Sequence, residues 1–152
     1  MTSNVVQLPA GPKWRVLVAH QRDDVRHVLR TLIEAENVAV IEAADGDVAL
    51  AKLESLQFDL LVLQLDLPQK DGLTLMQLHR VLLAYERPQA DPPAVLLTLA
   101  PEVRNNVALT DHLSALGVAD FIDDAPRADV AARVDDILQA RAARRAGKPA
   151  AA

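Results

Sequence analysis

Oxygen-bearing side chains follow a buried apolar run in the middle of the chain. The segment LLVLQLDLPQKDG, residues 60–72, passes from leucine and valine to Gln64 and Asp66, and then to Pro68 and Gly72. An apolar run that ends in a proline and a glycine is typical of a buried strand followed by an exposed loop. The polar residues that follow such a strand are the first candidates for a functional site.

Three other segments place polar residues directly after short apolar runs, at 20–24, 98–102 and 123–127. If the runs are parallel strands, their carboxyl ends meet at one edge of a sheet, where the functional crevice of such sheets lies. We therefore expect His20, Gln21, Gln64, Thr98 and Asp124 to lie near one another.

The elements that must position these residues alternate along the chain. Short apolar runs predict strands at 16–19, 38–43, 60–65, 94–98 and 120–122, and helical periodicity predicts helices at 24–35, 47–56, 73–85, 101–117 and 127–145. The first helix carries an apolar face that includes Val28, and Asp23 is its expected cap; Leu78 is expected on the inner side of the third. Alternation of this kind predicts an α/β fold with right-handed crossovers and a parallel sheet covered on both faces.

Composition restricts the function further. The chain has 152 residues, 51% hydrophobic and 3% aromatic, so we expect one domain at 14–145 with an aliphatic core, between flexible tails at 1–13 and 146–152. It has no cysteine, which excludes thiolate chemistry and sulfur-based zinc sites. No membrane-spanning run or secretion signal is recognisable, so a cytoplasmic location is expected.

Histidines and basic residues give no clear site. The four histidines lack the spacing of a helical metal site, and we expect them at the surface or at helix boundaries: His20, His27, His79 and His112. The one basic cluster, residues 141–148, is expected to complement the dipole of the last helix. A net charge of −5 argues against nucleic-acid binding, and we expect no direct contact with DNA.

Four motifs in order resemble the receiver domain of two-component response regulators, over residues 15–140. The segment RVLVAHQRDDVRHVLRTL resembles the first strand and helix of that family, and FDLLVLQLDLPQKDGLTLM resembles its third strand and loop, with Pro68 and Gly72 at the family's separation. PAVLLTLA resembles its fourth strand and GVADFIDD its fifth. The resemblance implies a flavodoxin-like, doubly wound (βα)5 fold with five parallel strands in the order 2-1-3-4-5.

The same resemblance implies a phosphorylation mechanism. In the family an acidic pair helps to hold magnesium, an aspartate accepts a phosphoryl group from a histidine kinase, and a threonine and a lysine respond. Here His20 and Gln21 stand in place of the acidic pair, Gln64 in place of the acceptor and Asp124 in place of the lysine; only Thr98 and Phe121 match. A neutral amide cannot form an acyl phosphate, so we expect a degenerate receiver with no cofactor, no bound metal and no enzymatic activity.

Three functions remain in competition at this stage. The first is an atypical response regulator that is not phosphorylated and acts by binding a protein: a histidine kinase, a phosphotransfer protein, another regulator or a second copy of itself. The second is a phosphorylatable receiver that uses Asp66 as an unusual acceptor. The third is a small ligand-binding protein or enzyme on the same fold, with His20 as a catalytic base.

The family's partner surface is formed by the fourth helix, the fifth strand and the fifth helix, and the sequence departs from the family there. The segment 98–117 has room for about one extra helical turn, and RPQADPP at 87–93 reads as a loop insertion. Either these are tolerated surface insertions or they remodel the docking face.

Overall fold

Residues 13–147, the part of the chain that the computed structural model describes, form five strands and six helices, which alternate except that two helices precede the last strand. The predicted tails lie almost wholly outside these residues. The elements, in chain order, are β1 (Trp14–Ala19), α1 (Asp23–Ile33), β2 (Val38–Ala43), α2 (Gly46–Ser55), β3 (Leu60–Gln64), α3 (Gly72–Glu86), β4 (Ala94–Leu99), α4 (Pro101–Arg104), α5 (Val107–Ala115), β5 (Asp120–Asp123) and α6 (Asp129–Arg145).

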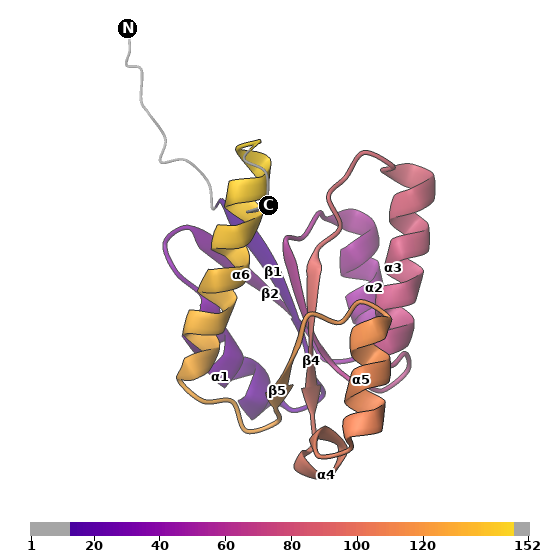
Figure 1. Cartoon of the computed structure of the whole chain (residues 1–152), viewed down its shortest axis with the longest axis vertical. Helices are drawn as coiled ribbons and strands as arrows, with labels where there is room; N and C mark the ends of the chain where they lie inside the picture. Colours follow the sequence, from indigo (N-terminus) through magenta and orange to yellow (C-terminus); the bar gives the residue numbers. More distant parts are fainter. Residues whose placement is uncertain (1–12, 148–152) are drawn as a thin grey trace, which may run out of the picture.

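The strands form one parallel sheet in the order β2-β1-β3-β4-β5, as predicted. Helices α1 and α6 cover one face, and α2, α3 and α5 cover the other, as Figure 1 shows. All carboxyl ends of the strands therefore lie at the same edge, which is the lower edge in Figure 1. No helix within residues 13–147 is long and apolar enough to cross a bilayer.

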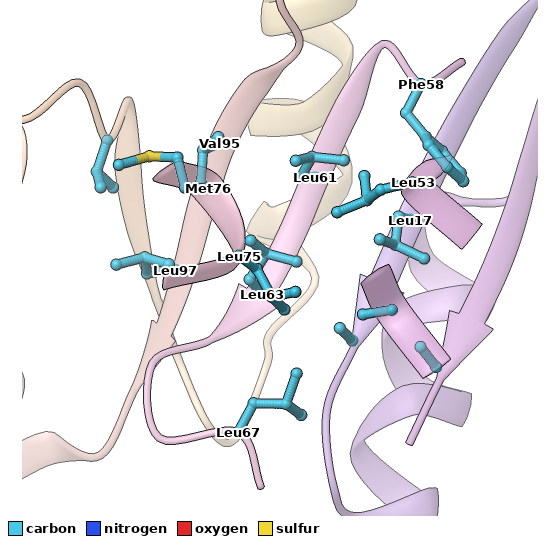
Figure 2. Packing of buried hydrophobic residues seen from close by; sticks show 14 of the residues in the cluster. Leu17, Leu53, Phe58, Leu61, Leu63, Leu67, Leu75, Met76, Val95 and Leu97 are labelled. Carbon is cyan, nitrogen blue, oxygen red and sulfur yellow. The ribbon is translucent and has the colours of Figure 1, made fainter. Parts of the chain in front are cut away.

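Strand side chains alternate between two buried clusters. Leu17, Leu61 and Leu97 pack with α2, α3 and α5, whereas Val62 and Leu96 pack with α1 and α6. Figure 2 shows the first cluster, in which leucines of β3 lie against those of α2 and α3. Burial of each large aliphatic side chain contributes about 1.5–3 kcal/mol, so both faces must stay apolar and neither can be turned to solvent.

The sequence predicts one continuous helix at 101–117, and this prediction is wrong. The structure has the short α4 and the separate α5, joined by Asn105 and Asn106. The Asn106 side chain accepts a hydrogen bond from the Leu109 amide at 3.1 Å and caps α5. An asparagine that caps a helix stabilises a new start rather than continuation, which is the physical reason for the break.

Smaller predictions about helices also need correction. Asp23 does not cap α1; Arg22 is the N-cap residue and makes no side-chain capping bond, while the Asp24 carboxylate accepts from the Val25 amide. Val28 on α1 and Leu78 on α3, which we expected to face the core, are each 39% exposed. Both lie at the margin of an apolar face, where periodicity alone does not fix burial.

Arg141 is not a surface cation of the last helix. It is buried, and its guanidinium donates to Asp59 Oδ1 at 3.1 Å, to the Pro92 carbonyl at 2.8 Å and to the Asp91 carbonyl at 2.7 Å. These bonds join α6 to the residue before β3 and to the loop 87–93. Because a buried charge left without its partner costs about 3–5 kcal/mol, the contact fixes the position of α6.

His79 is also buried, in contrast to the expected surface position, and faces inward from α3. Burial away from water lowers the pKa of its imidazole from 6.5 to about 4, and the nearby Arg87 guanidinium acts in the same direction. The ring is therefore neutral near pH 7. His27 and His112, by comparison, are exposed as expected.

This burial predicts a pH-dependent stability. Between pH 6.5 and 4 the unfolded chain binds a proton at His79 that the folded chain does not, so the free energy of unfolding falls as the pH falls through this range. The loss attributable to His79 reaches about 3 kcal/mol. Denaturant unfolding at several pH values should show a smaller decrease for His79→Leu than for the wild type. The exposed control His112→Leu should follow the wild type, and equal pH dependence in all three proteins would contradict the prediction.

Candidate functional site

The carboxyl ends of β1, β3, β4 and β5 bring the predicted residues to one edge of the sheet. Gln64 ends β3 and pairs in register with Thr98 on β4, while Leu99 pairs with Asp123 just before Asp124. His20 directly follows β1 and lies within hydrogen-bond distance of Asp124. The sheet thus gathers residues that are far apart in the sequence into one cleft.

His20 connects the loop after β1 to Asp124, which follows β5. Its Nδ1 accepts a hydrogen bond from the Arg22 amide at 3.1 Å, and its Nε2 lies 3.2 Å from Asp124 Oδ1. An Nδ1 atom that accepts carries no proton, so in the neutral ring the proton is on Nε2 and is donated to Asp124. The imidazole is buried and both ring nitrogens are engaged.

Gln64 uses both atoms of its side-chain amide. Oε1 accepts from the backbone amide of Gln21 at 2.8 Å, and Nε2 donates to Asp66 Oδ1 at 3.1 Å. The residue is 2% exposed, so it bridges the β1–α1 loop and the β3–α3 loop from inside the protein. A carboxylate at this position could accept from Gln21 but would repel Asp66.

The loop after β3 is held in a tight shape. Gln69 has a φ of 73°, and the Lys70 amide donates to the Pro68 carbonyl at 2.9 Å, which defines a γ-turn centred on Gln69. A Cβ atom at Gly72 would lie 2.7 Å from the Gln64 carbonyl oxygen, so only glycine permits this close approach to β3. The loop therefore combines a left-handed residue with a glycine contact directly beside Gln64.

Arg26 is a functional candidate that sequence reasoning missed. Its guanidinium donates to the His20 carbonyl at 2.6 Å and to Glu42 Oε1 at 3.2 Å, and it also pairs with Asp23. The residue lies on α1 four positions after the N-cap, which is a helical signal that could have placed it beside the β1 end. It fixes the backbone of the β1–α1 loop.

Thr98 and Phe121 differ in their hydrogen bonding. Thr98 is buried, and within residues 13–147 its hydroxyl has no hydrogen-bond partner even though it neighbours Gln64. Phe121 is partly buried against the cluster of α2, α3 and α5. Its carbonyl accepts from Arg104 at 3.1 Å and from Arg133 at 2.8 Å, which links β5 to α4 and α6.

The donor atoms of the cleft do not fit a magnesium ion. His20 and Gln64 have their acceptor atoms occupied by backbone amides, and Asp66, which is exposed, already accepts from Gln64. Magnesium prefers several carboxylate or water oxygens in octahedral geometry. Among residues 13–147 there is no group of three or more His, Cys, Asp or Glu side chains arranged to hold a metal. The predicted lack of a cofactor stays a prediction.

Comparison with known proteins identifies the family. The family model described as the response regulator receiver domain matches residues 16–124. The chain belongs to the response regulator receiver family. The matched range includes His20, Gln64, Thr98 and Asp124 but ends before α6.

Individual relatives agree with this assignment. The chain is 33% identical over 93 residues to the transcriptional regulatory protein ResD of Bacillus subtilis, a match that covers 61% of this chain and 36% of ResD. It is 25% identical to the receiver domain of AraT, a response regulator from Geobacillus stearothermophilus, with a TM-score of 0.69 and coverage of 86% and 98%. A Francisella response regulator receiver domain, 20% identical, has a TM-score of 0.68 with coverage of 83% and 97% and supports the fold alone.

The chain spans well under half the length of the curated relatives that it matches. Similarity therefore concerns the receiver domain, not the whole of those proteins.

The two amide bonds of Gln64 predict a measurable role in stability. Gln64→Ala removes the buried side chain that accepts from the Gln21 backbone amide and donates to Asp66, and we expect the free energy of unfolding to fall by about 1–3 kcal/mol. Denaturant unfolding measures this loss. Gln57→Ala, the same change at an exposed glutamine, should alter stability by less than about 0.5 kcal/mol. Equal effects of the two substitutions would show that the bridge contributes nothing.

Proposed function

We propose that this receiver domain does not accept a phosphoryl group and acts by binding another protein. The observation that carries the proposal is Gln64, a buried amide at the end of β3 whose Oε1 and Nε2 are both engaged. By the family resemblance this is the position of the phosphoacceptor. An amide there forms no acyl phosphate, and its engagement with two loops gives it a structural role.

The contact between His20 and Asp124 supports the same proposal. The family has a carboxylate at the first of these positions and a lysine at the second, whereas here the first is a ring that donates and the second is a carboxylate. The negative group now stands at the second position and the first position donates a hydrogen bond to it, so the pair remains complementary. A phosphoryl group near Asp124 would meet a negative charge, and two unit charges about 4 Å apart repel by roughly 4 kcal/mol at an effective dielectric of 20.

Phosphoryl transfer requires cancellation of negative charge by a metal and a cation. The cleft has neither a donor set that suits magnesium nor the family's lysine, and Lys70 in the nearby loop pairs with Asp47. The chain is accordingly a regulator without enzymatic activity or cofactor, and its alternative acceptor Asp66 serves as the hydrogen-bond partner of Gln64.

The surface of α4, α5, β5 and α6 is the proposed docking face. Arg104 and Arg133 both donate to the Phe121 carbonyl. Arg104 also pairs with Asp123, and Arg133 with Asp120, so the charged side chains of this face are held in place by one another. Val107 at the start of α5 is 65% exposed beside it. Protein interfaces combine apolar contacts with a polar rim, and Val107 with these charged pairs offers both kinds of contact. The partner is a histidine kinase, a phosphotransfer protein, another regulator or a second copy.

Phosphotransfer can be tested by intact mass after incubation with acetyl phosphate and magnesium. We expect no phosphoryl adduct on the wild type, because no carboxylate occupies the acceptor position and Asp124 opposes the incoming charge. The combined variant His20→Asp, Gln64→Asp and Asp124→Lys restores one member of the acidic pair, the acceptor and the lysine, and should gain an adduct at residue 64. A phosphorylated Asp66 in the wild type would overturn the proposal in favour of the unusual acceptor.

The docking face can be tested with two matched valines. Val107→Asp places a charge at α5, and Val81→Asp places the same charge on the outer face of α3, where Val81 is 56% exposed. With the tagged chain as bait in a cell extract, and light scattering for self-association, we expect Val107→Asp to lose the partner bound by the wild type. Val81→Asp should retain it. The opposite result would move the docking face to α3.

A further inference from the structure

A second cavity lies at the opposite end of the sheet from the cleft. It has a volume of about 440 Å³ and is formed by the start of β1, the residues before β3 and β4, and the ends of α3 and α6. These ends lie at the top of Figure 1, whereas the cleft lies at the bottom. The volume falls within the roughly 300–1,000 Å³ of ordinary small-molecule sites.

The cavity is strongly cationic although the chain carries a net charge of −5. Two carboxylates line it, Asp59 and Asp91. They face five cationic side chains, an excess of three positive charges: Lys13, Arg15, Arg87, Arg141 and Arg145. A concave surface of one sign concentrates ligands of the opposite sign, which here are anions.

Some of these cations already have partners. Arg141 is saturated by Asp59 and the 91–92 carbonyls, and Arg145 binds Asp59 and lies with its guanidinium 4.9 Å from the centre of the Trp14 ring. Lys13 lies over the same ring at 5.2 Å. These contacts hold the side chains of Arg141, Arg145 and Lys13 in place. A ligand in the cavity must therefore accept hydrogen bonds from other residues.

Arg87 and His79 are the residues of the cavity wall that can still donate hydrogen bonds to a ligand. Within residues 13–147, the buried atoms Arg87 Nη1 and His79 Nε2 have no hydrogen-bond partner, and both residues line the cavity. His79 is only 3% exposed. Each unpaired buried polar group costs about 1–3 kcal/mol, so two such groups at one cavity need a compensating contact.

We propose that this cavity binds a phosphate-bearing small molecule, with Arg87 and His79 donating to its phosphate oxygens. A guanidinium matches the geometry of a phosphate and forms charge-assisted hydrogen bonds with it. A phosphate oxygen between the two side chains satisfies both unpaired atoms and offsets the excess positive charge. The inserted loop 87–93 contributes Arg87 and one wall, which gives that insertion a role in binding.

The experiment uses the full chain and inorganic pyrophosphate as the probe, with calorimetry for affinity and amide NMR shifts for location. Pyrophosphate should bind and shift the signals of Trp14, His79 and the 57–59 segment. Arg87→Gln and His79→Leu should each weaken binding by about tenfold or more, the loss of one charge-assisted bond. Arg22→Gln, which removes an exposed cation at the other end of the sheet, should change affinity less than about twofold.

His79→Leu separates binding from folding. Removal of an unpaired buried ring nitrogen should keep or raise the stability of the free protein while binding is lost, an outcome that a damaged fold cannot produce. The proposal is overturned by a lack of pyrophosphate binding, by binding that is insensitive to both substitutions, or by shifts confined to the cleft. Tighter binding of citrate than of pyrophosphate would overturn the phosphate class.

Discussion

The geometry of the cleft depends on the two hydrogen bonds of the Gln64 side chain. One amide group connects the loop after β1 to the loop after β3, at the point where both strands end and water is excluded. Gly72 lets the following loop approach β3, and the γ-turn at Gln69 directs the chain back toward α3. A neutral amide suits this role because it donates and accepts at once, whereas a carboxylate only accepts.

Polar side chains in the cleft satisfy one another with hydrogen bonds. His20 donates to Asp124 across the ends of β1 and β5, and Arg26 holds the backbone of the same loop. Protein hydrogen bonds thus occupy Nδ1 of His20 and Oε1 of Gln64. The hydroxyl of Thr98 is the exception, since it is buried without a partner in the described residues. The cleft is therefore a closed hydrogen-bonded network with one unsatisfied member.

Local patterns predicted the fold well because each face of the sheet requires apolar residues at fixed intervals. The strand at 38–43 and the sheet order agree with the structure, and the helix ends differ by one or two residues. The break at Asn105 and Asn106 was missed because apolar spacing continues through it, while the decisive signal is a side-chain cap.

Burial of polar residues was harder to predict. His79 and Arg141 read as ordinary helix residues, and only contacts with segments far away in the chain make them internal; Arg141 and Asp59 are 82 positions apart. In the cleft, the family resemblance located His20, Gln64 and Asp124 correctly at one edge. The tautomer of His20 and the bond from the Gln21 amide depend on backbone orientation, which side-chain patterns do not encode.

The anchoring of α6 by Arg141 limits how two copies of this chain can associate. An exchange of the last helix between protomers would first have to withdraw a guanidinium from Asp59 and from two loop carbonyls. That withdrawal leaves Asp59 and two carbonyls of the loop 87–93 without these bonds, so the barrier to swapping is high. A dimer then forms by contact between intact outer surfaces, and its population is set by protein concentration rather than by refolding.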